Sequence, residues 1–161
     1  MNVGTIMRTK LILVKQDCPF PELLRKLSGH SPHQAYVVND EYRLLGIISS
    51  KDLLTQMIPS YLSADLARSF TDETDFFVKQ LERLKDKRAD EFMNSKPVSL
   101  EQHHQLLEAD ALIAEHGFNT LPVVDNQGRI IGEVTRMDIL SQLVNSDTSV
   151  KEDDLIDVSK L

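Results

Sequence analysis

The sequence has little cysteine, which limits how the fold can be held together. Its 161 residues include one cysteine, Cys18, so no disulfide can form within the chain. Structural disulfides belong to oxidising compartments, and a lone cysteine favours a reducing, cytoplasmic setting. The first ten residues, MNVGTIMRTK, contain no long apolar run, so we expect neither a signal peptide nor a membrane anchor. No segment reaches the ~20 apolar residues that a transmembrane helix needs.

The chain also lacks an excess of positive charge. It has 18 lysines and arginines against 25 aspartates and glutamates, a net charge of -7 and a pI near 5.2. General binding to nucleic acid or to anionic membranes requires a basic surface, so both are excluded as partners. A small anionic ligand remains compatible with this balance, because a few local cations or backbone N–H groups suffice to bind it.

Familiar catalytic motifs are missing as well. There is no G-x-S-x-G elbow, no phosphate-binding loop with its lysine and no G-x-G-x-x-G. Cys18 has no second cysteine to pair with. His103 and His104 stand near two glutamates, but a solvated helix start explains them better than a metal site, since four converging ligands are not evident. We therefore expect no catalytic residue, no metal, no cofactor and no enzymatic activity.

An internal repeat is present. When the sequence is shifted by 86 positions, residues 3–58 align with 89–144 without a gap, and twelve of the 56 pairs are identical. Average composition would give about three identities by chance. The identical pairs include Met7/Met93, Val37/Val123, Val38/Val124, Gly46/Gly132 and Asp52/Asp138. The chain therefore contains two copies of one unit.

The periodicity of each copy predicts the order β-α-β-β-α. In the second copy the expected elements are an extended segment, a helix, two strands joined by NQG, and a helix, at 96–100, 103–117, 120–125, 129–134 and 135–145. The first copy repeats this order with LILV, a helix from Phe20 to about Leu27, AYVV, RLLGII and SKDLLTQMI. One unit has too little core to stand alone, so two units should bury their sheets against each other.

We therefore predict an α/β (α+β) fold of two repeats packed sheet to sheet with pseudo-twofold symmetry and clefts along the seam. The expected boundaries are repeat one at 1–58, a linker with a helix at 59–88, repeat two at 89–145 and an acidic tail at 146–161. In the linker, Phe77, Leu81 and Leu84 form an apolar stripe. This stripe either packs on its own repeat, which we favour, or forms a dimer contact.

Each repeat carries one further motif, GIISSKD at 46–52 and GEVTRMD at 132–138. A hydroxyl followed three positions later by an acid at a helix start is a capping box. The glycine three residues earlier is not part of that box and indicates close backbone approach to a partner repeat or a ligand. The motif therefore has two readings, a helix cap and half of a binding site.

These features resemble a tandem pair of CBS domains, or Bateman module. The likeness rests on Met7 and Met93 before the first strands, the doublets Val37-Val38 and Val123-Val124, and the repeated Gly-h-h-Ser/Thr-x-x-Asp. It covers most of the chain outside the linker and tail. The family's fold agrees with β-α-β-β-α. The resemblance implies a regulatory sensor that binds an adenosine-containing ligand (AMP, ADP or ATP, alternatively cyclic di-AMP or S-adenosylmethionine) between repeats, forms a homodimer and acts on a separate, unknown protein.

The resemblance also implies roles for individual residues. Asp52 and Asp138 match the aspartate that binds ribose hydroxyls, and Ser49 and Thr135 match the hydroxyl beside it. Residues of the adenine slot and of phosphate binding would be Ile12, Val98, His33, Asn119, Arg136, Lys10 and Lys96. Because Arg136 brings a cation, we expect the cleft of Asp138 to be the better candidate.

Some positions depart from the pattern. Tyr36 stands where repeat two has Pro122, and could narrow or stack in an adenine slot. Glu133 stands where an aliphatic residue is usual, and would repel phosphate if it faced a cleft. The two clefts should therefore differ, and one could be empty. An interaction module with vestigial clefts is the alternative function.

Overall fold

A computed structural model describes residues 1–29, 34–144 and 155–161 of the chain. Both repeats have the predicted order. In repeat one the elements are β1 (Ile12–Val14), α1 (Phe20–Ser28), β2 (Gln34–Val38), β3 (Leu44–Ser49) and α2 (Ser50–Met57). In repeat two they are β4 (Leu100–Glu101), α6 (Leu106–His116), β5 (Thr120–Val124), β6 (Ile130–Thr135) and α7 (Arg136–Val144). The predicted extended segment at 96–100 is shorter than expected as a strand. Pro97 has no N–H to donate to a neighbouring strand, and pairing begins only at Leu100.

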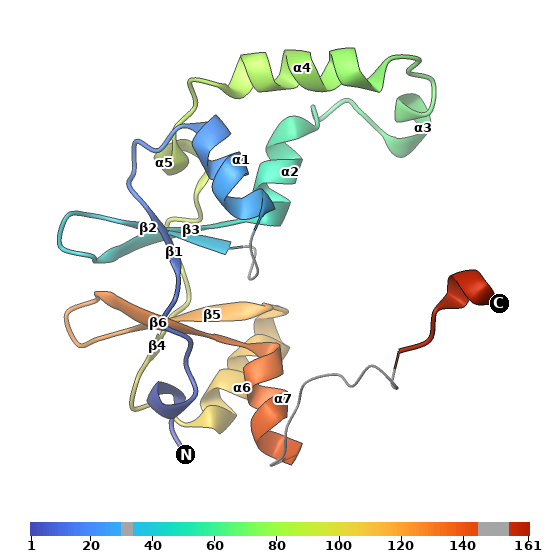
Figure 1. Cartoon of the computed structure of the whole chain (residues 1–161). Helices are drawn as coiled ribbons and strands as arrows, with labels where there is room; N and C mark the ends of the chain where they lie inside the picture. The colour runs from blue at the N-terminus through green and yellow to red at the C-terminus, as the bar shows by residue number, and fades with distance from the viewer. Residues whose placement is uncertain (30–33, 145–154) are drawn as a thin grey trace.

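Each repeat forms one three-stranded sheet with the same topology. The strand orders are β1-β2-β3 and β4-β5-β6, with the first pair parallel and the second antiparallel in both sheets. The registers also match, because Val37 faces Gly46 and Val123 faces Gly132. Figure 1 shows the two sheets adjacent at the centre of the molecule, with α1 and α2 on one outer side and α6 and α7 on the other. The mixed fold and the pairing of two repeats are confirmed.

Apolar side chains fill much of the seam between the sheets. Tyr36, Val38 and Ile130 are buried there, and partly buried leucines and isoleucines of β1 and β3 pack around them. Each repeat also has its own core beneath its helices. Burial of apolar surface at ~25 cal/mol per Å² therefore stabilises both the repeats and their association.

The segment that leads into each repeat packs on the opposite repeat. Val3, in the short 3-10 helix η1 (Val3–Thr5), is fully buried in the core of repeat two. Ala89, in α5 (Ala89–Phe92), is fully buried in the core of repeat one. Figure 1 shows the N-terminal turn lying beside repeat two, and α5 lying beside α1. Each packed core therefore includes the first segment of the other sequence repeat. We call these two segments, which contain Val3 and Ala89, the crossing segments.

Gly46 and Gly132 are the places where the crossing segments touch the strands. A Cβ on Gly46 would stand 2.5 Å from Sδ of Met93 and 2.9 Å from the carbonyl oxygen of Asn94. A Cβ on Gly132 would stand 2.6 Å from Sδ of Met7 and 2.9 Å from the carbonyl oxygen of Arg8. The glycine of the repeated motif therefore permits close approach of the partner repeat, one of the two readings of that glycine.

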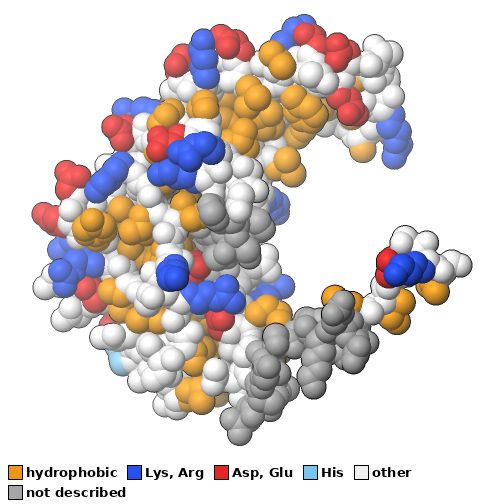
Figure 2. Space-filling model, viewed as in Figure 1, with side chains coloured by type: hydrophobic (Ala, Val, Ile, Leu, Met, Phe, Trp, Pro, Cys, Tyr) orange, Lys and Arg blue, Asp and Glu red, His pale blue; other side chains and the backbone are white. Residues whose placement is uncertain are grey.

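The linker contributes α3 (Ala64–Ala67) and α4 (Glu73–Leu84), which form an arm above repeat one (Figure 1). Leu84 is buried in the core of repeat one and Leu81 packs against that core, whereas Phe77 is exposed. The stripe thus packs mainly on its own repeat. Figure 2 shows apolar side chains gathered along this arm; the exposed ones include Leu66, Phe70, Phe77 and Val78.

The end of the tail, residues 155–161, is exposed and forms a short 3-10 turn at Val158–Lys160. None of the helices built by the described residues has the length and apolar character that crossing a membrane requires.

Candidate functional site

One cavity opens at the seam between the repeats, beside the first copy of the repeated motif. Its volume is about 200 Å³. Repeat one supplies the end of β3 and the start of α2, while repeat two supplies the segments before β4 and around the start of β5. The lining residues are Gln34, Ile47, Ser49, Asp52, Asn94, Val98, Phe118, Thr120 and Leu121. The cavity is therefore built by both repeats. We refer to it as the Asp52 cleft.

The two carboxylate oxygens of Asp52, a residue that lines the cleft, differ in their hydrogen bonds. Oδ2 accepts a hydrogen bond of 2.8 Å from the backbone N–H of Ser49, and the N–H of Asp52 donates to Oγ of Ser49 at 3.2 Å. These two bonds complete the capping box at the start of α2. Among the described residues, no protein donor bonds to Oδ1. One oxygen thus caps the helix, while the other is available to a ligand hydroxyl in the cavity that Asp52 lines.

The walls of the Asp52 cleft are apolar on both sides. Ile47 comes from β3, and Val98, Phe118 and Leu121 come from repeat two. Polar groups of Gln34, Asn94 and Thr120 complete the lining. Apolar walls with a few polar groups are typical of small-molecule sites, and the cavity is smaller than their usual ~300 Å³ minimum.

Shifting these residues by 86 positions locates the corresponding cleft around Asp138. Asn94 is replaced there by Arg8, and Ile47 by Glu133. The backbone fixes these replacements in equivalent places, because Arg8 and Glu133 exchange two hydrogen bonds of 2.8 and 2.9 Å, just as Asn94 and Ile47 exchange bonds of 2.9 and 3.1 Å. The two clefts have the same backbone framework, but two neutral residues of the Asp52 cleft are replaced by ionisable ones at Asp138.

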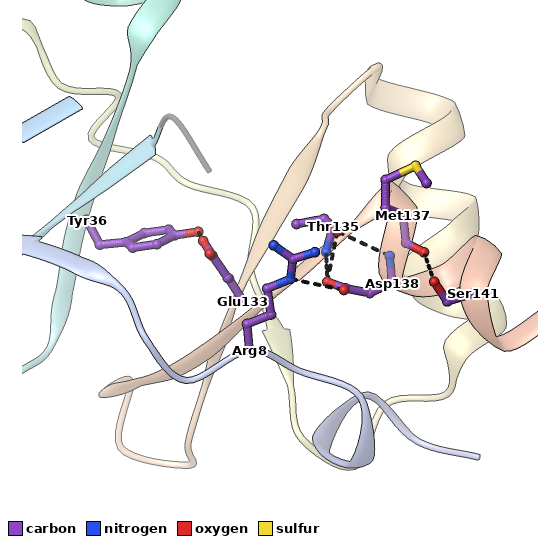
Figure 3. A network of polar contacts seen from close by, with 7 residues as sticks. All are labelled: Arg8, Tyr36, Glu133, Thr135, Met137, Asp138 and Ser141. Carbon is purple, nitrogen blue, oxygen red and sulfur yellow. Dashed lines mark hydrogen bonds and ion pairs between the residues drawn. The ribbon is translucent and has the colours of Figure 1, made fainter. Parts of the chain in front are cut away.

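Arg8 bonds directly to Asp138. Its Nε lies 3.0 Å from Oδ1 of Asp138, and the side chain of Asp138 is mostly shielded from solvent. Oδ2 of Asp138 accepts from both the N–H and the hydroxyl of Thr135, each at 2.8 Å. Figure 3 shows the guanidinium of Arg8 between Glu133 and Asp138. Both carboxylate oxygens of Asp138 are therefore bonded within the chain, unlike those of Asp52.

Glu133 is fully buried at the seam. Its Oε2 accepts a short hydrogen bond from the hydroxyl of Tyr36, which is itself fully buried (Figure 3). Its Oε1 is buried and has no hydrogen-bond partner among the described residues. Burial raises the pKa of the Glu133 carboxyl, against the lowering effects of the Tyr36 bond and the Arg8 charge. Tyr36 thus bonds to Glu133 across the seam, in the region of the Asp138 cleft.

The structure brings together only part of the predicted site. Ser49, Asp52 and Val98 line the same cavity. Thr135 and Asp138 are adjacent in the second cleft. Val98 precedes β4 and is not within a strand, contrary to the expectation of a first-strand position. Ile12 lies in β1 and packs against the core of repeat one.

The predicted phosphate-binding residues are less concentrated. Lys10, Lys96 and Asn119 are exposed and do not line the Asp52 cleft. Arg136 donates to the carbonyl oxygens of Phe118 at 2.7 Å and of Gly117 at 3.0 Å. Its guanidinium is thus bound to the loop of Phe118, which lines the Asp52 cleft, and these two bonds do not involve Asp138. His33 lies outside the described residues.

The preference for the cleft of Asp138 is not supported by this geometry, because Arg8 occupies its carboxylate while a cavity lies at Asp52. Sequence reasoning missed Arg8, Asn94, Ile47 and Phe118. The signal for two of them was available: Arg8 and Asn94 are mismatched positions directly after the matched methionines Met7 and Met93. A mismatch directly after an identical pair marks a position where the two clefts carry different side chains on an equivalent backbone.

Two other features are weaker candidates for a functional site. A wider groove of about 580 Å³ lies in repeat one near Cys18, but its lysines already pair with neighbouring acids, Lys15 with Asp40 and Lys26 with Glu22. Within the described ranges no cluster of three or more metal-binding side chains occurs. His103 and His104 each lie near one glutamate.

Known proteins share this architecture. The CBS domain family profile matches residues 3–58 and 89–145. A CBS domain-containing protein of Dictyostelium discoideum is 31% identical over 142 residues, covering 88% of this chain and 90% of that protein. The magnesium transporter MgtE of Thermus thermophilus is 29% identical over 147 residues, of which the match covers only 27% of the transporter.

Two solved structures are similar and contain nucleotides. The complex of CBSX2 with AMP has a TM-score of 0.69 and 25% identity, and the match covers 89% of this chain and 96% of that one. The cytosolic domain of the Mg²⁺ channel MgtE in complex with ATP has a TM-score of 0.65 and 27% identity, with 88% of this chain and 48% of that chain covered.

Proposed function

The chain belongs to the CBS domain family as a tandem pair of repeats, and from this premise we propose that it is a regulatory module that binds an adenine nucleotide in the Asp52 cleft. The observation that carries the proposal is the divided carboxylate of Asp52, with one oxygen in the helix cap and the other available in a cavity made by both repeats. A ribose cis-diol presents hydroxyl donors that an ionised carboxylate binds well.

The remaining groups fit the other parts of a nucleotide. The apolar side chains of Ile47, Val98 and Leu121 can enclose a purine ring. The hydroxyl of Ser49 and the first N–H groups of α2 are placed to favour an anion, because a helix N-terminus carries partial positive charge. CBSX2 with AMP and MgtE with ATP support an adenine nucleotide as the ligand class.

A module of this kind would regulate a partner protein through a ligand-dependent change in its own conformation. Both repeats line the cleft, so a bound ligand bridges them and can alter their relative position, provided that the two states differ in affinity for it. The proposed role is non-enzymatic, is exerted in the cytoplasm and is directed toward a separate regulated protein.

A homodimer is part of the same proposal. Leu54 on α2 and Leu140 on α7 are equivalent by the repeat, and they are 66% and 52% exposed. A second copy of the chain would cover these apolar side chains through a self-matching contact, as a twofold interface requires. Sedimentation should then show a dimer that Leu54→Glu weakens; a monomer at all concentrations would exclude it.

The ligand can be tested by thermal unfolding and by calorimetric titration with AMP, ADP, ATP, cyclic di-AMP and S-adenosylmethionine. A ligand present at ~100 times its Kd should stabilise the chain by about 2.7 kcal/mol. Asp52→Ala should lower the affinity at least tenfold. Asp138→Ala is the matched control, because it removes the same capping group from the other repeat. An interaction module with vestigial clefts would show no response to any of these ligands.

A further inference from the structure

The two clefts are not equally available. In the Asp52 cleft Asn94 lines the same cavity as Asp52, and its side-chain oxygen accepts from the N–H of Lys96 at 3.1 Å. At Asp138 the equivalent position belongs to Arg8, whose guanidinium bonds to the carboxylate at 3.0 Å. A side chain of the protein therefore holds the oxygen of Asp138 that corresponds to the available oxygen of Asp52.

We infer that Arg8 is an internal occupant of the Asp138 cleft, so that each chain binds one nucleotide, at Asp52, and not two. This inference rests on the proposed function and specifies its stoichiometry. A nucleotide entering the Asp138 cleft would have to displace a charge-assisted hydrogen bond, which is a stronger bond than one between neutral groups.

The neighbouring pair adds a second obstacle. Glu133 stands where the Asp52 cleft has Ile47, and it bonds to Tyr36 across the seam. A purine ring would there meet a buried carboxyl and a tyrosine hydroxyl in place of an apolar wall. An ionised Glu133 would also repel the phosphates. Ile47, the equivalent residue at Asp52, is apolar and has no such effect.

Backbone geometry makes Arg8 a specific determinant of this difference. Arg8 is held opposite Glu133 by two backbone hydrogen bonds, and Asn94 is held opposite Ile47 in the same manner. Exchange of the two side chains should therefore leave the backbone pairing intact. Such an exchange moves the occupant from one cleft to the other.

The test is a reciprocal exchange, measured by calorimetric titration with AMP and with ATP. The unmodified chain should bind one equivalent, and Asp138→Ala should not reduce that number. Arg8→Asn in a Glu133→Ile background should bind a second equivalent, because Asp138 is then flanked by the same two residue types as Asp52, whereas Glu133→Ile alone should not, because Arg8 still holds Asp138. Asn94→Arg should weaken binding at Asp52 at least tenfold. Two equivalents in the unmodified chain, a second equivalent in Glu133→Ile alone, none in Arg8→Asn/Glu133→Ile, or undiminished binding in Asn94→Arg would each overturn the inference.

A measurement without ligand tests the occupancy of the Asp138 cleft by Arg8 independently of nucleotide binding. The stabilities of Arg8→Ala, Asp138→Ala and the double variant form a cycle in denaturant unfolding. If Arg8 occupies Asp138 in solution, the double variant loses less than the sum of the single losses. Additive losses overturn the occupancy even when nucleotide binds. Non-additive losses together with no nucleotide binding would leave the Arg8–Asp138 pair in place and refute the proposed function.

Discussion

Tyr42 and Gly128 occupy the same place in their repeats and have the same left-handed backbone, with φ of 64° and 79°. Both follow a turn in which an acidic or amide side chain, Asn39 or Asp125, accepts two backbone N–H groups through Oδ1. Glycine adopts this conformation without steric cost, but tyrosine does not. Repeat one therefore contains local strain that repeat two avoids.

This strain predicts opposite effects for two substitutions. Tyr42→Asn should raise the free energy of unfolding by about 0.5–1 kcal/mol, because asparagine tolerates the left-handed region. Gly128→Ala should lower it by about 1 kcal/mol through backbone strain alone, since no atom lies within 4 Å of the added Cβ. Urea unfolding measures both. A loss of stability in Tyr42→Asn would mean that the Tyr42 side chain, which lies near Lys15, outweighs the strain.

Gly46 tests the crossing of the segments between repeats. Gly46→Ala should destabilise the chain by about 1–3 kcal/mol, because the methyl group would push into Met93 and the backbone of Asn94. Gly29→Ala is the control, since nothing lies within 4 Å of its added Cβ. Surface changes of that kind usually alter stability by less than ~0.5 kcal/mol. Equal effects of the two alanines in thermal unfolding would show that the close approach at Gly46 is unimportant.

Glu133 predicts a component of pH-dependent stability. Burial raises its folded-state pKa above the ordinary value of 4.5, so the folded chain holds this proton more tightly than the unfolded chain does. Stability from this group is full below the ordinary carboxyl pKa and is lost as pH rises through the raised value. Glu133→Gln, which cannot ionise but can still accept from Tyr36, should therefore be the more stable protein at pH 8, by about 1–3 kcal/mol.

The comparison should be made by urea unfolding from pH 4 to 8. The difference between the unmodified chain and Glu133→Gln should widen with rising pH. Glu41→Gln is the control and should show no such trend, because its side chain is 78% exposed and its charged neighbour, Arg43, keeps its charge over this range. A constant difference at every pH would contradict the burial effect.

Cys18 is predicted to be unreactive. Burial raises the pKa of its thiol to about 11, so very little nucleophilic thiolate is present near neutral pH. Iodoacetamide at pH 7.5 should modify the folded chain at least tenfold more slowly than the urea-unfolded chain. Rapid labelling of the folded chain would indicate that α1 opens readily around the thiol.

Local patterns were sufficient to predict much of this fold. Hydrophobic periodicity and turn residues located the strands and helices of both repeats, and hydroxyl-x-x-Asp correctly indicated the capping box at Ser49 and Asp52. The paired repeats followed from the sequence identity between the copies. Within the site, Ser49, Asp52 and Val98 do meet in one cavity.

Long-range contacts were outside the reach of those patterns. The ion pair of Arg8 with Asp138 joins residues 130 positions apart, and no periodicity links them. Placing Val3 in the core of repeat two likewise depends on the path of the chain in three dimensions. The sequence could therefore predict which residue types stand in the clefts, whereas the difference between the two clefts required the folded arrangement.

The crossing segments have a consequence for how the molecule can be divided. A chain cut between residues 58 and 89 would separate each core from a buried residue that it needs, Val3 from repeat two and Ala89 from repeat one. Although the sequence is a duplication, neither half contains all of its own core. We expect the whole chain to unfold in one cooperative transition, and two separately produced halves to acquire stable structure only when they are mixed and exchange their first segments.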